Sequence, residues 1–120
     1  MINYIDTERI EKLSNADESV PLYQKVIKLS EESGELAQAF LKFDGSKNTS
    51  ASAGGKVEDV LEEACDVLNV TVDIINALTK GNPALELYTK NLFQKKLDKW
   101  EAKQQGYAYA QKTEAFTLEG

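Results

Sequence analysis

The chain has 120 residues, 42% of them hydrophobic and 28% charged, which is ordinary for a single globular domain spanning residues 1–120. Its formal net charge of −6 repels nucleic acid polymers, and it contains neither a signal-peptide segment nor an apolar run long enough to span a membrane. The absence of histidine excludes Ser-His-Asp triads, imidazole zinc sites and Glu-x-x-His di-iron bundles, while the single cysteine, Cys65, excludes internal disulfides and suits a reducing cytoplasm.

Two helices are predicted in the first third of the chain from the spacing of apolar residues. The first is short and covers about residues 7–15. The second runs from about Pro21 to Lys42, and Ser19, just upstream, is its predicted N-cap. Apolar residues at helical spacing form one stripe along this second helix: Leu22, Val26, Leu29, Leu36 and Phe40.

Two further helices are predicted in the rest of the chain. A Gly- and Ser-rich connection at residues 44–55 separates the second helix from a third over about residues 56–79. A fourth covers about residues 83–104, with Asn82 as its N-cap. Residues 105–120 show no clear period and are predicted to form a tail.

The expected architecture is all-α: an antiparallel four-helix bundle, because short connections make consecutive helices antiparallel neighbours. The third helix has a main apolar stripe that includes Leu61, Leu68 and Val72, and further apolar residues on a second side, at Val67 and Val70. A helix that is apolar on two sides is buried on two sides. In so short a chain, oligomerisation would help to bury such a helix.

Acidic residues are unusually concentrated in the predicted third helix. Between residues 57 and 79 there is no Lys or Arg, but there are six acids: Glu58, Asp59, Glu62, Glu63, Asp66 and Asp73. The positive end of the helix dipole explains those in the first turn. It does not explain Asp66 or Asp73, so positive charge must reach them from elsewhere. In the second helix, Lys28 has the spacing to pair with Glu31 or Glu32.

The register of the two helices brings their acids to the same level. With a rise of about 1.5 Å per residue, Glu35 and Glu63 both lie about 10 Å from the connection. One turn further along, Glu32 and Asp66 are level with each other. Four converging carboxylates with no sulfur or imidazole donor favour a hard cation, Mg²⁺ or Mn²⁺. The alternative interpretation is an ordinary solvated acidic face.

The segments "KLSEESGELAQAF" and "EEACDVLNVTVDI" resemble the MazG-like all-α nucleoside triphosphate pyrophosphohydrolases. The signature of that family is E-x-x-E followed, after a variable gap, by E-x-x-D. Here it corresponds to Glu32 and Glu35, then Glu63 and Asp66, and the resemblance covers about residues 20–104. It implies a MazG-like bundle that forms a homodimer or homotetramer, with these four acids as the ligands of Mg²⁺.

The resemblance also implies an activity: hydrolysis of a (deoxy)nucleoside triphosphate to the monophosphate and pyrophosphate, for example to remove non-standard dNTPs. Glu31, beside the ligands, would either hold them in position or deprotonate the attacking water. Basic residues late in the fourth helix would contact phosphate: Lys96, Lys99 and Lys103. Trp100 departs from the family pattern, which often has Asn at this position. The alternative to phosphate contact is that these lysines only extend their charged ends into solvent near the end of the helix. Asn69 would bind a phosphate or a metal-bound water, or is an ordinary surface residue.

Two other functions remain open on the same sequence. One is the related phosphoribosyl-ATP pyrophosphohydrolase activity, which uses another substrate on the same scaffold. The other is a helical module that binds a partner without turnover. The residues that would bind a base are not identified by the sequence, and the connection at residues 44–55 is either a lid over the substrate or a slack linker.

Overall fold

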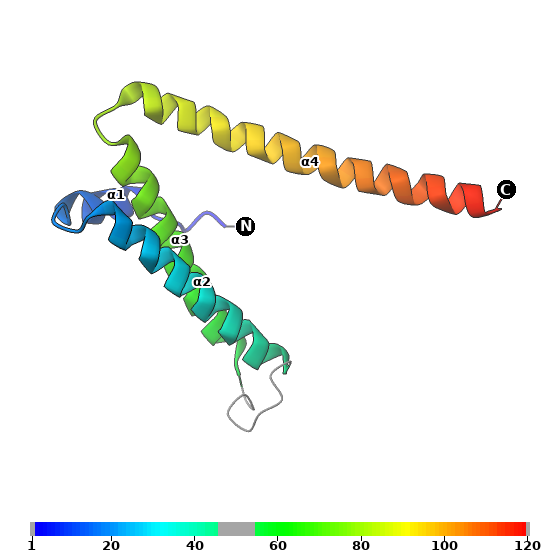
Figure 1. Cartoon of the computed structure of the whole chain (residues 1–120), viewed down its shortest axis with the longest axis horizontal. Coiled ribbons are helices and arrows are strands. Elements are labelled where there is room, and N and C mark those ends of the chain that lie inside the picture. Colours follow the sequence, from blue (N-terminus) through cyan, green and yellow to red (C-terminus); the bar gives the residue numbers. More distant parts are fainter. Residues whose placement is uncertain (1, 46–54, 120) are drawn as a thin grey trace. The chain divides into compact units, whose positions relative to one another are not determined.

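The computed structural model describes residues 2–45 and 55–119, of which residues 107–119 are described by their backbone alone. These residues form four α-helices and no strand, so the predicted all-α class is confirmed (Figure 1). None of the described helices is long and apolar enough to cross a membrane. Most of the predicted connection at residues 44–55 lies outside the described residues. The chain divides into two compact units, Met1–Leu78 and Thr79–Gly120.

The first unit contains the helices that carry both acidic motifs. They are α1 (Thr7–Ala16), α2 (Leu22–Asp44) and α3 (Val57–Thr79). Helices α2 and α3 lie side by side and run antiparallel, as the register argument requires (Figure 1). Helix α1 lies against α3, with which Ser14 and Asn15 form hydrogen bonds. The predicted bounds of all three helices agree with the structure to within about two residues.

The starts of α1 and α2 use different capping chemistry. The Asp6 carboxylate accepts a hydrogen bond from the backbone N–H of Arg9 (3.0 Å) and so caps α1. The predicted Ser19 cap of α2 is wrong. Pro21 is the N-cap, with extended backbone angles and no side-chain hydrogen bond. Ser19 lies two residues before this N-cap, so it is not at the position from which a side chain usually caps a helix.

Two glycines shape the end of α2 and the entry to α3. Gly45 has a φ of 77°, and its N–H donates to the carbonyl groups of Leu41 and Lys42, which closes α2. A Cβ on Gly55 would lie 2.5 Å from the backbone carbonyl carbon of Lys42. Only glycine permits so close an approach. The contact holds the start of α3 against the end of α2 and thereby helps to set their register.

The most buried side chains of the described residues are polar. Ser14, Lys25 and Glu32 are buried, whereas none of the described apolar side chains is fully buried. Along α3, every residue from 70 to 77 is partly buried. Because these residues cover more than two turns, α3 is covered on several sides, as expected for a helix with two apolar faces.

Four residues form a polar clamp that joins the three helices of the first unit: Ser14 on α1, Lys25 on α2, and Asp73 and Asn76 on α3. The Lys25 ammonium lies 2.7 Å from Asp73 Oδ1, and the Ser14 hydroxyl donates to the same oxygen. Asn76 Nδ2 donates to Ser14 Oγ (3.0 Å) and to Asn15 Oδ1 (2.9 Å). Lys25 is the positive charge from outside α3 that Asp73 requires.

The second unit consists of α4 (Pro83–Glu119) and the turn before it. Asn82 Oδ1 accepts from the N–H of Leu85 (3.1 Å), so the predicted N-cap is confirmed. The predicted end near Gln104 is wrong, since the helix continues to Glu119. No proline follows Gln104, and nothing lies within 4 Å of a Cβ built on Gly106. A single glycine costs a helix only about 1 kcal/mol, which is too little to end it.

Candidate metal centre

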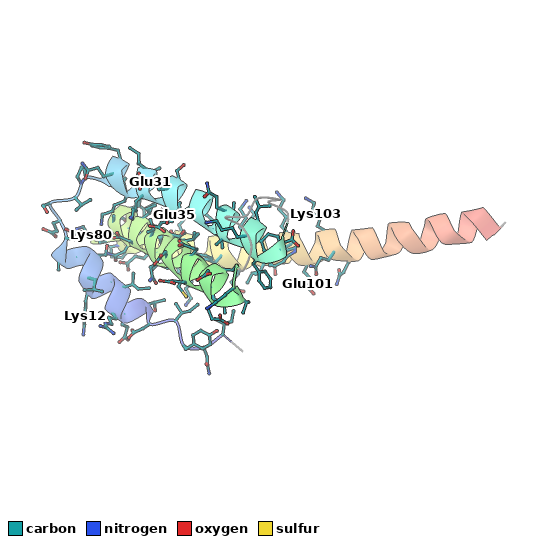
Figure 2. All side chains as sticks on the ribbon, turned by 90° about the horizontal axis from the view of Figure 1, so that it is seen from below. Lys12, Glu31, Glu35, Lys80, Glu101 and Lys103 are labelled. Carbon is teal, nitrogen blue, oxygen red and sulfur yellow. The ribbon has the colours of Figure 1, made fainter. Side chains whose placement is uncertain are left out.

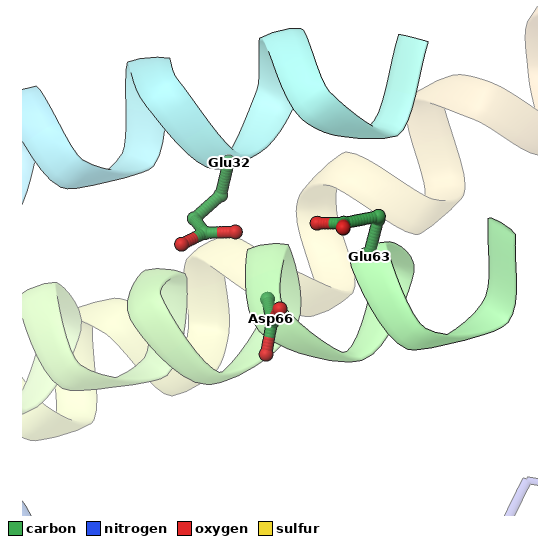
Figure 3. Close-up of side chains that lie close together, drawn as sticks. All are labelled: Glu32, Glu63 and Asp66. Carbon is green, nitrogen blue, oxygen red and sulfur yellow. The ribbon is translucent and has the colours of Figure 1, made fainter. Parts of the chain in front are cut away.

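Three of the four motif acids meet between α2 and α3. Glu32 projects from α2 toward α3, where Glu63 and Asp66 lie one turn apart (Figure 3). One carboxylate oxygen from each of the three lies within 4.8 Å of the others. This is the convergence that the antiparallel register predicts. Glu35 is not part of this group of three, but its charge and a side-chain hydrogen bond act on Glu63, so it is a close neighbour.

Glu32 is the buried member of this carboxylate cluster, which consists of Glu32, Glu63 and Asp66. It lies one turn after Leu29 and one turn before Leu36, so the helical period carries it to the inner side of α2. Only 5% of its surface is exposed. Its Oε1 pairs with the Lys28 ammonium at 3.0 Å, while its Oε2 is buried and finds no hydrogen-bond donor among the described residues. A buried, unsatisfied carboxylate oxygen is costly and calls for a cation or a donor.

Glu63 is half-buried, and its Oε2 also lacks a donor within the part of the chain that the structure describes. Burial raises the pKa of Glu63. The negative charge of Glu35, a hydrogen bond with Glu35, and the charges of Asp66 and Glu32 raise it further. The other three motif acids therefore all act on Glu63. Their mutual repulsion would be relieved by a proton or by a bound cation.

Lys28 supplies local positive charge to the site. The hydrogen bond with Glu32 raises the pKa of Lys28, as does the attraction of Glu32, Glu31 and Glu35. Of the two partners that the sequence allowed, the structure selects Glu32 for the ion pair. One ammonium group cannot balance several carboxylates, so the site as a whole retains negative charge.

A cavity of about 270 Å³ lies next to the carboxylate cluster and shares Glu63 with it. Its other lining residues are Glu35, Gln38, Ala39, Lys42, Asp59 and Glu62. A water molecule occupies about 30 Å³ in the liquid, so the cavity has room for several. Mg²⁺ usually keeps some of its waters and shares its ligands with substrate phosphates, and an open space beside the carboxylates suits that mode of binding.

The other predicted site residues lie in different places. Glu31 is exposed on α2 (Figure 2). Asn69 lines two cavities that also involve α1, and not the cavity beside Glu35 and Glu63. The three lysines predicted to contact phosphate are exposed on α4, in the second unit, and are not part of the site described here: Lys96, Lys99 and Lys103. Their phosphate-binding roles, and that of Asn69, stay predictions.

Lys42 is the site residue that sequence reasoning missed. It lines the cavity beside Glu35 and Glu63 and is the one lysine or arginine among the described residues of that lining. The signal was present in the spacing, because Lys42 follows Glu35 by two helical turns and so lies on the same side of α2.

The donor set fits a hard divalent cation. It contains carboxylate oxygens and no sulfur or imidazole, which suits Mg²⁺ and Mn²⁺. Glu32 and Glu63 each have a buried oxygen with no donor among the described residues. One carboxylate oxygen of Glu32 also lies within 4.8 Å of one of Glu63. Such a site has the charge and the free lone pairs to bind a metal ion, with Glu35 close enough to Glu63 to join the ligands.

Comparisons of the chain with known protein families, with curated proteins and with solved structures found no match. The chemical interpretation therefore rests on the carboxylates themselves, on their burial and on the doubled motif that brings them together.

Proposed function

We propose that this chain is a Mg²⁺-dependent nucleoside triphosphate pyrophosphohydrolase of the MazG-like type. It would hydrolyse a (deoxy)nucleoside triphosphate to the monophosphate and pyrophosphate, with non-standard dNTPs as the substrates to be removed. The observation that carries the proposal is the buried Glu32 carboxylate. One of its oxygens has no donor within the described part of the chain, and it faces Glu63 and Asp66 across the interface of two helices. The doubled acidic motif, on which the family resemblance is based, supplies these same residues.

In this proposal Glu32, Glu63 and Asp66, joined by Glu35, hold Mg²⁺ or Mn²⁺. The bound ion would neutralise phosphate charge and lower the pKa of the attacking water. Glu31, exposed next to Glu32, is the candidate to take up the proton of that water. Water adds to phosphorus, the anhydride bond between the α- and β-phosphates breaks, and pyrophosphate leaves.

The test is product analysis with a panel of dNTPs, with Mg²⁺ present or chelated. We expect pyrophosphate rather than single phosphate to be released, and only with the metal. The Glu32→Gln variant should lose at least about 100-fold in kcat/KM, because an amide cannot replace the buried carboxylate as a ligand. Glu11→Gln makes the same chemical change on the exposed surface of α1 and should leave activity unchanged.

Each alternative function gives a different result in this assay. Turnover of phosphoribosyl-ATP but of no dNTP would assign the chain to the related pyrophosphohydrolase activity. Equally low release by the unaltered chain and by Glu32→Gln, with every substrate, would contradict the enzyme proposal and favour a non-enzymatic binding module.

We also propose that the chain functions as a homodimer or homotetramer. The supporting observation is that no apolar side chain of the described residues is fully buried, while large apolar side chains on α2 and α3 such as Val26, Phe40 and Leu61 are at least half exposed. An apolar surface of this extent favours association. Light scattering coupled to size-exclusion chromatography should give two or four times the mass of the chain. A monomeric mass that persists at high protein concentration would contradict this.

A further inference from the structure

Lys28 occupies a position at the carboxylate cluster that the proposed chemistry does not use. It lies one turn before Glu32 on α2, and its ammonium is 3.0 Å from Glu32 Oε1. Glu32 Oε2, on the same carboxylate, is buried and has no donor among the residues that the structure describes. One carboxylate thus has one oxygen bound to a cationic side chain and the other available within the carboxylate cluster.

The two partners of this ion pair differ in exposure. The Lys28 side chain is 57% exposed, whereas that of Glu32 is 7% exposed. Glu32 is therefore held in place by its surroundings, while Lys28 can leave without disturbing the packing of α2. Glu31, three residues after Lys28 and also exposed, offers the ammonium group another partner on the same helix surface.

We propose that Lys28 is a built-in placeholder cation: it neutralises Glu32 in the metal-free protein and gives up that contact when a divalent ion binds the carboxylate cluster. The inference rests on the proposed metal-binding function and extends it to a residue outside the ligands. It makes Lys28 a determinant of metal affinity, because every binding event must break the contact between Lys28 and Glu32.

The physical reason is competition for one carboxylate. An ammonium group and a divalent ion on the same carboxylate repel each other, and the repulsion is stronger where burial excludes water. Without Lys28, the metal-free carboxylates would repel one another more strongly, and the ion would not have to displace a cation. Both effects make metal binding more favourable when the charge of Lys28 is removed.

The test uses the full chain with Lys28→Met, titrated with Mn²⁺ and followed by electron paramagnetic resonance of the free ion, and with Mg²⁺ followed by calorimetry. We expect Lys28→Met to bind both ions about three- to tenfold more tightly, because hydrogen bonds to charged groups have effects of this order and this one is partly exposed. Lys28→Gln, which keeps a polar group without the charge, should also bind more tightly. Lys12→Met, on α1 (Figure 2), is the matched control and should bind as the unaltered chain does.

A second readout is the stability of the metal-free protein. Lys28→Met should unfold at a lower urea concentration than the unaltered chain when the metal is chelated, and this difference should shrink at saturating Mg²⁺. A structural role for Lys28 alone would leave the difference the same in both conditions, which would overturn the inference.

The outcomes separate this inference from the proposed function. Equal or weaker metal binding by Lys28→Met and Lys28→Gln would overturn the inference alone, and weaker binding would mean that Lys28 orients Glu32 for the ion. If the unaltered chain binds neither Mn²⁺ nor Mg²⁺, this result would contradict the proposed metal site and, with it, the inference about Lys28.

Discussion

Replacing Glu63 by glutamine is expected to have two opposite effects. It should make the metal-free protein more stable at neutral pH, and it should abolish both stabilisation by Mg²⁺ and nucleotide hydrolysis. The side chain keeps its size but loses its charge. The loss of charge removes repulsion from Glu35, Asp66 and Glu32, and it also removes a carboxylate that the proposed ion needs.

The pH dependence of the first effect follows from the raised pKa of Glu63. Above the ordinary glutamate value of 4.5, the unfolded chain loses this proton while the folded chain still holds it. The contribution of Glu63 to stability is therefore present below that value and is lost as the pH rises through the raised pKa. Glu63→Gln has no such loss, so its advantage over the unaltered chain should grow across this window and then level off. Mg²⁺ affinity of the unaltered chain should rise over the same range, because the ion must displace the proton.

Urea unfolding between about pH 4 and pH 8, with and without Mg²⁺, measures both effects. At a free Mg²⁺ concentration 100 times its dissociation constant, the unaltered chain should gain about 2.7 kcal/mol, and Glu63→Gln should gain nothing. Its kcat/KM should fall at least about 100-fold. Glu58→Gln, in the first turn of the same helix, is the control. It should keep both the stabilisation by Mg²⁺ and the hydrolytic activity. A metal-free Glu63→Gln protein less stable than the unaltered chain at neutral pH would contradict the repulsion argument.

The antiparallel register of α2 and α3 was the most informative part of the sequence. It placed Glu32 level with Asp66, and these two residues belong to the carboxylate cluster. The same register also aligns residues outside the acidic motifs. Two turns before Glu32 is Lys25, two turns after Asp66 is Asp73, and these two residues form the buried ion pair. The sequence showed that Asp73 needs a positive charge from another helix, and the register identifies Lys25 as its source.

Register could not settle details that depend on local packing. Glu31 and Glu32 are both within helical reach of Lys28, and burial decides between them, because the pair with the buried Glu32 is less screened by water. Glu35 is level with Glu63 but outside the group of three, because a glutamate side chain has several rotatable bonds and its level along the helix does not fix its oxygen positions.

The starts of α1 and α4 are each marked by a capping side chain. Asn82 caps α4 and Asp6 caps α1 through specific hydrogen bonds, and such residues can be recognised in a sequence. The end of α4 at Glu119 carries no such mark. The prediction is wrong there because loss of the amphipathic period does not by itself end a helix. A helix can continue without an apolar stripe when neither proline nor a series of glycines interrupts it.

Breaking the polar clamp at Asp73 is the second large effect that we expect. Asp73 Oδ1 accepts from both the Lys25 ammonium and the Ser14 hydroxyl, and Lys25 is only 6% exposed. Asp73→Asn keeps the shape of the side chain but leaves the buried ammonium without a counter-charge. Removing one partner of a buried pair costs about 3–5 kcal/mol; because Asp73 is 28% exposed and water can reach it, we expect about 3 kcal/mol in urea unfolding.

A double substitution distinguishes an uncompensated charge from simple loss of packing. In Lys25→Met combined with Asp73→Asn, the polar clamp contains no buried charge and the amide oxygen can still accept from Ser14, so the protein should be within about 1 kcal/mol of the unaltered chain. Asp98→Asn, on the exposed surface of α4, should change stability by less than about 0.5 kcal/mol. If the double variant is as unstable as the sum of its single variants, the clamp does not act as a charge pair.

The same variants test whether the clamp and the carboxylate cluster are independent. Asp73 lies two turns from Asp66, about 10 Å along α3, and its carboxylate bonds to Ser14 and Lys25, which lie outside the carboxylate cluster. Sites at this separation without shared partners usually have additive effects. Asp73→Asn should therefore lower stability with and without Mg²⁺ by the same amount and leave Mg²⁺ affinity unchanged. A large loss of affinity would instead show that the clamp fixes the register on which the carboxylate cluster depends, since α2 and α3 carry both.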